Sequence, residues 1–233
     1  MRPPASWRAT ASPYVSSSPR PPRAVLAVRE YGCIAGVNVT ASHNPKEYNG
    51  YKVYWQDGAQ LPPHHAEAIA KKMEELDFFA SIKRMDYDEA VEKGLITVMG
   101  AETDEKFLSN VMGQVNDKAA VEKVADTFKM VYTPFHGTGY KLIPEALRRL
   151  GMKHVICVPE QMVIDGNFPT VVSPNPENPE ASIWLWIWPR RRGRTLSSAP
   201  TPTPTGWASW CAPPTGSSRC SPATRPACCC WTT

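Results

Sequence analysis

The order of apolar and polar residues divides the middle of the chain into short strands and helices. Residues 33–39 form an apolar run and residues 51–55 alternate, so both predict strands, and a polar turn separates them. Residues 65–76 and 104–115 carry apolar side chains at helical spacing and predict two helices. The apolar positions are Ile69, Met73 and Leu76 in the first helix, and Phe107, Leu108 and Val111 in the second.

A strand, a turn, a helix and a second strand follow further along the chain. Residues 128–133 and 154–158 predict strands, and residues 134–139 form a glycine-bearing turn after the first of them. The helix between the strands ends near Gly151, which suits its C-cap. Its inward positions are Leu142, Ile143, Ala146, Leu147 and Leu150. This βαβ order predicts parallel pairing and an α/β fold. A change of composition over residues 121–127 indicates a boundary between two α/β domains.

Composition excludes some classes of function. The 233 residues are 42% hydrophobic and 21% charged, which is typical of a globular protein. The net charge of +4 is mild and does not indicate a nucleic-acid partner. No apolar run is long enough to span a bilayer, and the start lacks the apolar core of a signal peptide. We therefore expect a cytoplasmic protein with no membrane partner, and the composition specifies no oligomeric state.

Both ends of the chain differ from its middle. Residues 1–23 are rich in Pro, Ser, Arg and Ala, while the tail holds six of the eight tryptophans and five of the seven cysteines. The adjacent cysteines at 228–230 are poorly spaced for a tetrahedral zinc site, and a disulfide framework is not expected without secretion. Residues 190–194, Arg-Arg-Arg-Gly-Arg, are open to interpretation as a nucleic-acid patch or a flexible basic stretch. We expect irregular structure over residues 1–26 and 182–233.

The polar turn after residue 39 concentrates candidate chemistry around one serine. Ser42 is flanked by Thr40, His43, Asn44 and Lys46, which combine a nucleophilic hydroxyl, hydrogen-bond donors and positive charge. Adjacent side chains diverge in an extended segment, and no GxSxG elbow is present, so a Ser-His hydrolase pair is not expected. Phosphoryl transfer fits better, because it depends on positioning and charge neutralisation. The alternative is an ordinary turn that caps a helix beginning at Pro45.

Three further sites leave alternatives open. Lys52 is either a solvated strand lysine or an acid/base that points back at the serine. The Gly-Thr-Gly turn at residues 137–139 either cradles a phosphate at a helix N-terminus or is a plain strand-to-helix turn. His136 is either a ligand or a hydrogen-bonded structural histidine.

Two motifs in this region resemble those of a known family. Residues 40–45, Thr-Ala-Ser-His-Asn-Pro, and residues 49–52, Asn-Gly-Tyr-Lys, are similar to motifs of the α-D-phosphohexomutases, the phosphoglucomutase/phosphomannomutase family. The resemblance continues through residues 131–139, 165–169 and 173–179, and it covers roughly residues 25–181.

The resemblance implies a phosphoserine mechanism that interconverts hexose 1- and 6-phosphates. Ser42 would pass its phosphoryl group to a hexose phosphate and regain the other one from the reoriented bisphosphate. Lys52 would be the general acid/base near the sugar hydroxyl, and His43 and Asn44 would shape the phosphoserine loop together with Thr40 and Lys46. The resemblance also implies hexose 1,6-bisphosphate as activator or intermediate. Mg²⁺ would be held by the phosphate on Ser42 and by an Asp-x-Asp-x-Asp-Arg loop.

The same resemblance divides the α/β fold into parts of two domains. Residues 27–125 correspond to the C-terminal part of domain I with the serine turn, and residues 126–181 to the βαβ start of domain II. No Asp-x-Asp-x-Asp-Arg occurs in the sequence, and the family's third and fourth domains have no counterpart in it. We therefore expect a truncated, inactive fragment of a mutase. A non-catalytic sugar-phosphate-binding fragment and a protein that interacts through its basic tail are the alternatives.

A frameshift near residues 181–182 accounts for the unusual tail. One permitted coding of residues 199–207 yields T-D-P-D-A-D-R-M when it is translated from the third base of the first codon. This is the missing aspartate loop. With suitable third bases, the same offset allows a helix running into a strand over residues 182–198, and L-L-L-D-Y over residues 228–233. We interpret the tail as translated in the wrong reading frame. We interpret the first 26 residues in the same way, but no equally clear sequence in another frame is recovered for them.

We predict that the DNA across codons 181–182 contains a shift of frame relative to the family. Sequencing of independent clones checks this. An uninterrupted frame that encodes the printed tail in every clone would contradict it.

Overall fold

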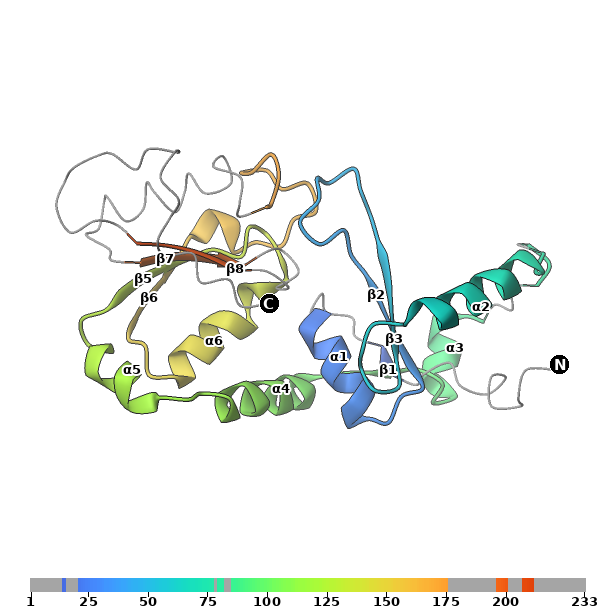
Figure 1. Cartoon of the computed structure of the whole chain (residues 1–233), viewed down its shortest axis with the longest axis horizontal. Coiled ribbons are helices and arrows are strands. Elements are labelled where there is room, and N and C mark those ends of the chain that lie inside the picture. Colours follow the sequence, from blue (N-terminus) through green and yellow to red (C-terminus); the bar gives the residue numbers. More distant parts are fainter. Residues whose placement is uncertain are drawn as a thin grey trace. The chain divides into compact units, whose positions relative to one another are not determined.

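The chain forms two compact units. The computed structural model describes residues 14–15, 21–77, 79–81, 85–175, 196–200 and 207–211. Within these ranges, the first unit consists mainly of residues 23–38 and 52–103, and the second of residues 39–51 and 104 onward. Both combine strands with helices (Figure 1), which confirms the predicted α/β class.

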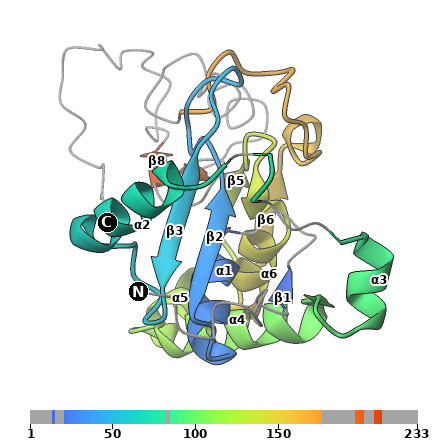
Figure 2. The ribbon, with the colours of Figure 1, turned by 90° about the vertical axis from the view of Figure 1, so that its right-hand side faces the viewer.

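A two-stranded sheet and one helix form the centre of the first unit. β2 (Ala35–Val39) and β3 (Tyr51–Trp55) run side by side in opposite directions (Figure 2). Helix α1 (Pro21–Glu30) begins with proline, which is favoured at a first helical position, and buries Ala27 and Val28. Gly36 allows close contact between β2 and α1, because a Cβ at this position would lie 2.6 Å from Val28 Cγ2.

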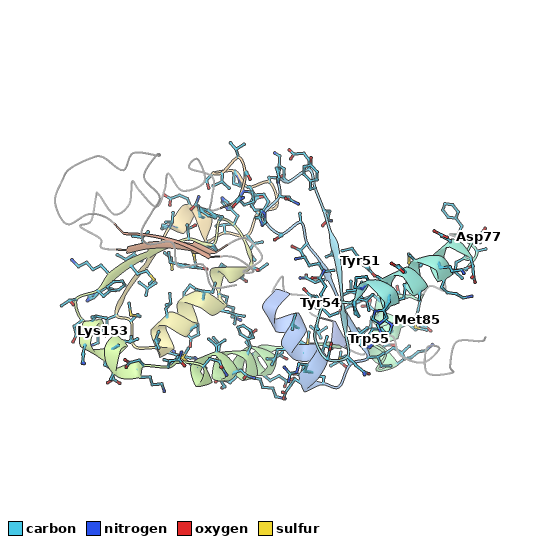
Figure 3. The ribbon with its side chains drawn as sticks, in the orientation of Figure 1. Tyr51, Tyr54, Trp55, Asp77, Met85 and Lys153 are labelled. Atoms are coloured by element: carbon cyan, nitrogen blue, oxygen red, sulfur yellow. The ribbon has the colours of Figure 1, made fainter. Side chains whose placement is uncertain are left out.

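Helix α2 follows this sheet and leaves Met73 exposed, whereas Ile69 is half-buried. The other elements of the unit are β1 (Tyr14–Val15), α2 (Pro63–Glu74), α3 (Tyr87–Glu92) and β4 (Thr97–Val98). The ring of Trp55 on β3 stacks on His65 of α2, with centroids 5.0 Å apart. No residue of α2 is buried, and Met73 and Leu76 are 64% and 54% exposed. In Figure 3, Tyr51, Tyr54 and Trp55 lie along β3, and Asp77 lies just beyond the end of α2.

The second unit is a βαβ arrangement to which a hairpin is added. Its strands follow the order β6-β5-β7-β8. β5 is parallel to both of its neighbours, β6 and β7. The βαβ order of the sequence predicted the parallel pairing of β5 with β6. β8 is antiparallel to β7. The elements are α4 (Ala101–Gly113), α5 (Lys118–Val124), β5 (Lys129–Tyr132), α6 (Leu142–Arg149), β6 (His154–Cys157), β7 (Leu196–Pro200), β8 (Trp207–Cys211) and the short 3₁₀ helices η2 (Thr138–Tyr140) and η3 (Pro159–Gln161).

The core of this unit surrounds β5. Val131 and Tyr132 have no exposed surface, and α5 and α6 lie on the same side of the sheet (Figure 1). Arg149 of α6 donates two hydrogen bonds to Glu105 of α4, at 2.7 and 2.6 Å. An open apolar hollow between α5, β5 and α6 is lined by Ala120, Val121, Val124, Phe128, Met130, Leu147, Leu150 and Met152.

These contacts explain why the compact units divide elsewhere than the composition suggested. The units separate between Thr103 and Asp104, within α4, whereas the change of composition lies near residue 125. Helix α5 contributes Val121 and Val124 to the lining of the open apolar hollow, together with residues of the second unit. The family domain boundary between residues 125 and 126 itself stays a prediction.

The ends also differ from the expectation of irregular structure. Residues 21–26 belong to α1, and residues 14–15 pair with residues 97–98. In the tail, β7 and β8 add two strands beside β5. Backbone pairing explains this, because an open edge of β5 presents N–H and C=O groups to any extended segment. The remaining residues of 1–26 and 182–233, including the basic stretch at 190–194, lie outside the described ranges.

A buried hydrogen-bond network fixes the turn that follows β5. The Thr133 hydroxyl donates to Gln161 Oε1 at 2.6 Å, and Gln161 Nε2 donates to Thr170 Oγ1 at 2.9 Å. The ring of His136 links Thr170 Oγ1 at 2.8 Å with the carbonyl of Val163 at 2.9 Å. Gln161 and Thr133 are fully buried. This network offsets backbone strain, since Phe135 and His136 have φ values of +47° and +61°.

We predict that Gln161→Met destabilises the second unit by about 3 kcal/mol, because it removes the acceptor of the buried Thr133 hydroxyl and a donor to Thr170. Urea unfolding measures the change. Glu160→Met, at the exposed neighbouring position, is the matched control and should change stability by less than about 0.5 kcal/mol. Equal stability of the two variants would contradict a structural role for the network.

Candidate active site: the serine turn

The serine turn, residues 40–50, joins β2 to β3 (Figure 2). The Thr40 N–H donates to the Gly50 carbonyl at 2.9 Å, which continues the pairing of the two strands. Beyond this bond, the N–H of Asn44 donates to Ala41 O at 3.1 Å and that of Tyr48 to Pro45 O at 3.0 Å. The segment therefore consists of two successive tight turns. No helix begins at Pro45, so the alternative of a helix cap is wrong.

Ser42 has a strained backbone. Its φ of +60° lies in the left-handed region, which is uncommon for residues other than glycine and costs about 1–2 kcal/mol. The Ser42 N–H donates to Thr40 Oγ1 at 2.9 Å, which offsets part of this cost. A strained nucleophile at a turn after a strand is a recurrent feature of functional sites.

The same conformation brings the hydroxyl of Ser42 to His43. Ser42 Oγ lies 3.3 Å from His43 Nδ1, at an exposed position. The prediction that these adjacent side chains diverge is therefore wrong. It assumed an extended backbone, whereas the left-handed turn at Ser42 places both side chains on one side. His43 is thus a candidate acceptor for the hydroxyl proton of Ser42.

Gly50 is a steric constraint of the serine turn that sequence reasoning did not single out. A Cβ at Gly50 would lie 2.2 Å from the Thr40 carbonyl oxygen, so only glycine allows the strands to approach here. The Asn49 side chain accepts the Gly50 N–H at 2.8 Å and supports the return to β3. The dipeptide Asn-Gly is a known turn signal, so the sequence did contain a sign of this constraint.

The other predicted site residues are not joined to Ser42 by hydrogen bonds. Lys46 is exposed, and the side chain of Asn44 is exposed at the tip of the first turn. Lys52 is the second residue of β3 and is half-buried. With Gly50 opposite Thr40, the alternation along the hairpin puts Lys52 opposite Asn38. Among the described side chains, none of the hydrogen bonds and ion pairs found involves Lys46 or Lys52.

The turn after β5 serves structure and offers little to a phosphate. The Gly137 N–H donates to Pro134 O at 2.8 Å, and the Tyr132 hydroxyl donates to Gly139 O at 3.0 Å. His136 is 3% exposed and bonded through both ring nitrogens, so it is a structural histidine. Of the two interpretations of residues 137–139, the plain strand-to-helix turn is favoured.

Two findings within the described ranges concern metal binding and membrane-spanning helices. No group of three or more His, Cys, Asp or Glu side chains converges there to hold a metal ion. None of the helices in these ranges is long and apolar enough to cross a lipid bilayer.

Comparison with known proteins identifies similar chains. A phosphoglucomutase of Staphylococcus saprophyticus is 34% identical over 160 residues, which are 69% of this chain and 28% of that protein. A glucose 1,6-bisphosphate synthase of Homo sapiens is 35% identical over 163 residues, 68% of this chain and 25% of that protein. The chain therefore spans about a quarter of the length of these relatives.

A solved structure shows the same fold. A proposed phosphomannomutase of Thermus thermophilus superposes with a TM-score of 0.67 at 18% identity, over 84% of this chain and 41% of the other.

Two domain models of one family match separate parts of the chain. The model of phosphoglucomutase/phosphomannomutase alpha/beta/alpha domain I matches residues 19–80. The model of domain II matches residues 105–184 and ends close to the point where the tail changes composition. Together they cover more than half of the sequence and include the serine turn. The chain belongs to the phosphoglucomutase/phosphomannomutase family.

Proposed function

We propose that Ser42 carries a phosphoryl group and that the serine turn transfers it to and from a hexose phosphate. The observation that supports this most is the 3.3 Å contact between Ser42 Oγ and His43 Nδ1 in an exposed, strained turn. Lys46 and Asn44 lie on the same turn and supply positive charge and hydrogen-bond donors. Such groups suit phosphoryl transfer, in which positioning and charge neutralisation provide most of the catalysis.

The loading step follows from the roles of these side chains. Ser42 Oγ attacks one phosphorus of a hexose 1,6-bisphosphate, and the bond from that phosphorus to the sugar oxygen breaks. His43 Nδ1 accepts the proton of the hydroxyl, and Lys52 protonates the sugar oxygen that leaves. In the reverse direction the protons return, and the phosphoserine donates its group to a hexose monophosphate. The two steps together interconvert hexose 1- and 6-phosphates.

Family membership and the relatives support this substrate class. One relative is named for the synthesis of glucose 1,6-bisphosphate and others for the isomerisation of glucose phosphate. We extend this substrate class to the present chain as part of the proposal, since its serine turn lies within the match to domain I.

The described residues do not by themselves fit the Mg²⁺ that the family resemblance implies. Mg²⁺ takes oxygen ligands in octahedral geometry, usually with carboxylates among them. Residues 40–50 include a single acidic side chain, Glu47, and no acidic trio converges elsewhere in the described ranges. No step of the transfer is therefore assigned to the metal.

We further propose that the 233-residue chain loads Ser42 slowly and does not complete a mutase cycle. Loading requires the Ser42–His43 contact of the serine turn and Lys52 on the adjoining strand β3. Return of the second phosphoryl group requires that the bisphosphate be held in a reversed orientation, and small misplacements of positioning groups cost catalysis heavily. If loading fails as well, a non-catalytic sugar-phosphate-binding protein is the next candidate, since the exposed Lys46 and Asn44 of the serine turn offer a positive charge and hydrogen-bond donors to a phosphate.

We predict that incubation with glucose 1,6-bisphosphate adds one phosphoryl group to the chain at Ser42. Intact mass spectrometry with peptide mapping detects it. Ser42→Ala should abolish the addition, while Ser81→Ala, an exposed serine in the other unit, should leave it unchanged. His43→Gln should slow loading by about 100-fold, because the proton acceptor is lost. Unmodified wild type, or equal labelling of Ser42→Ala, would contradict the proposal.

We predict that the purified chain converts glucose 1-phosphate to glucose 6-phosphate no faster than Ser42→Ala in a coupled assay. Turnover at the rate of a complete family enzyme would refute the expected inactivity. Calorimetry with glucose 1,6-bisphosphate separates the remaining possibilities. Saturable heat without labelling indicates a binding protein, and no heat indicates a chain that does not recognise the sugar phosphate.

A further inference from the structure

Thr40 is anchored in the hairpin and contacts the nucleophile. Its N–H donates to the Gly50 carbonyl at 2.9 Å, and its own carbonyl lies against the Gly50 Cα, where a Cβ would be 2.2 Å away. Its side chain extends forward to accept the Ser42 N–H at 2.9 Å. Thr40 therefore joins the end of the β2–β3 hairpin to the residue that bears the reactive hydroxyl.

The bond from Ser42 to Thr40 acts on the backbone of Ser42. The φ of +60° is unfavourable for serine, so the turn needs a local interaction that selects it. A β-branched threonine suits this, because its χ1 angle is restricted and its hydroxyl oxygen is therefore held in one direction. The left-handed conformation in turn places Ser42 Oγ 3.3 Å from His43 Nδ1.

We propose that Thr40 is a positioning residue whose hydroxyl oxygen holds Ser42 in the left-handed conformation and so directs Oγ toward His43. The family resemblance placed Thr40 in the phosphoserine loop without a specific role. That Thr40 holds the backbone of Ser42 follows from the geometry alone. That this affects catalysis rests on the proposed function. Two arms of one experiment test these two statements separately.

The first arm measures loading of Ser42 by glucose 1,6-bisphosphate across its concentration range. Thr40→Val keeps the shape of the side chain and removes the acceptor, so the saturating rate should fall about tenfold, the scale of one lost hydrogen bond to a strained backbone. The half-saturating concentration should not change. Thr40→Ser keeps the hydroxyl and should stay within about threefold of wild type. Thr97→Val, at an exposed position on β4, is the matched control.

The second arm measures hydrogen exchange of the Ser42 amide by NMR and needs no activity. Exchange should be slower in wild type and Thr40→Ser than in Thr40→Val. If Thr40→Val does not fold, Thr40→Cys replaces it, because a thiol sulfur is a much weaker acceptor than a hydroxyl oxygen.

The outcomes distinguish this proposal from the proposed function. A raised half-saturating concentration with an unchanged rate would show that Thr40 contacts the phosphate, and would overturn the proposal. Ser42 amide exchange that does not depend on the hydroxyl at position 40 would overturn it as well. If wild type is never labelled but exchange depends on Thr40, the proposed function fails and the positioning role of Thr40 is supported.

Discussion

The burial of β5 is the constraint on which the second unit depends. Val131 and Tyr132 have no exposed surface, and β5 has a parallel neighbour on each side. A buried strand must pair its N–H and C=O groups on both edges, because each unpaired group costs about as much as a lost hydrogen bond. This explains why residues 196–200 form a strand although their sequence, Leu-Ser-Ser-Ala-Pro, has little strand preference. Pairing with β5 outweighs local propensity there.

Strands β5 and β2 are each followed by a turn that contains left-handed residues other than glycine. Different hydrogen bonds stabilise the two turns. After β5, Phe135 and His136 are locked by a network that includes the fully buried Thr133 and Gln161. After β2, Ser42 is held by the partly buried bond to Thr40. The first turn is therefore part of the core, whereas the second belongs to the less stable surface of the protein. The Ser42 hydroxyl is accordingly accessible to solvent, as the proposed function requires, whereas the turn after β5 is enclosed.

Periodicity predicted much of the fold, and backbone conformation accounts for most of what it missed. β3 has the predicted bounds, and α4 and β5 agree within a few residues. Burial follows the predicted apolar positions at β5 and at Leu108 of α4, whereas β3 has no buried residue. For α2 the pattern located the helix, but Met73 and Leu76 are exposed, since spacing shows that a face is apolar and not that another element covers it. The Ser42–His43 contact was missed because it depends on one φ angle, which residue types alone do not specify.

The serine turn shows why family membership could be predicted more securely than activity. Its backbone bonds lie within residues 40–50, and the contacts of Ser42 to Thr40 and His43 span one or two positions, so a short stretch of sequence specifies the geometry. A metal site of three carboxylates has the opposite character, because its ligands must be brought together by the surrounding fold. The described ranges include the serine turn, whose geometry is specified locally. No acidic trio that could hold a metal ion converges within them. The contacts that position Ser42 therefore depend on the turn alone, whereas the convergence of three carboxylates would depend on the surrounding fold.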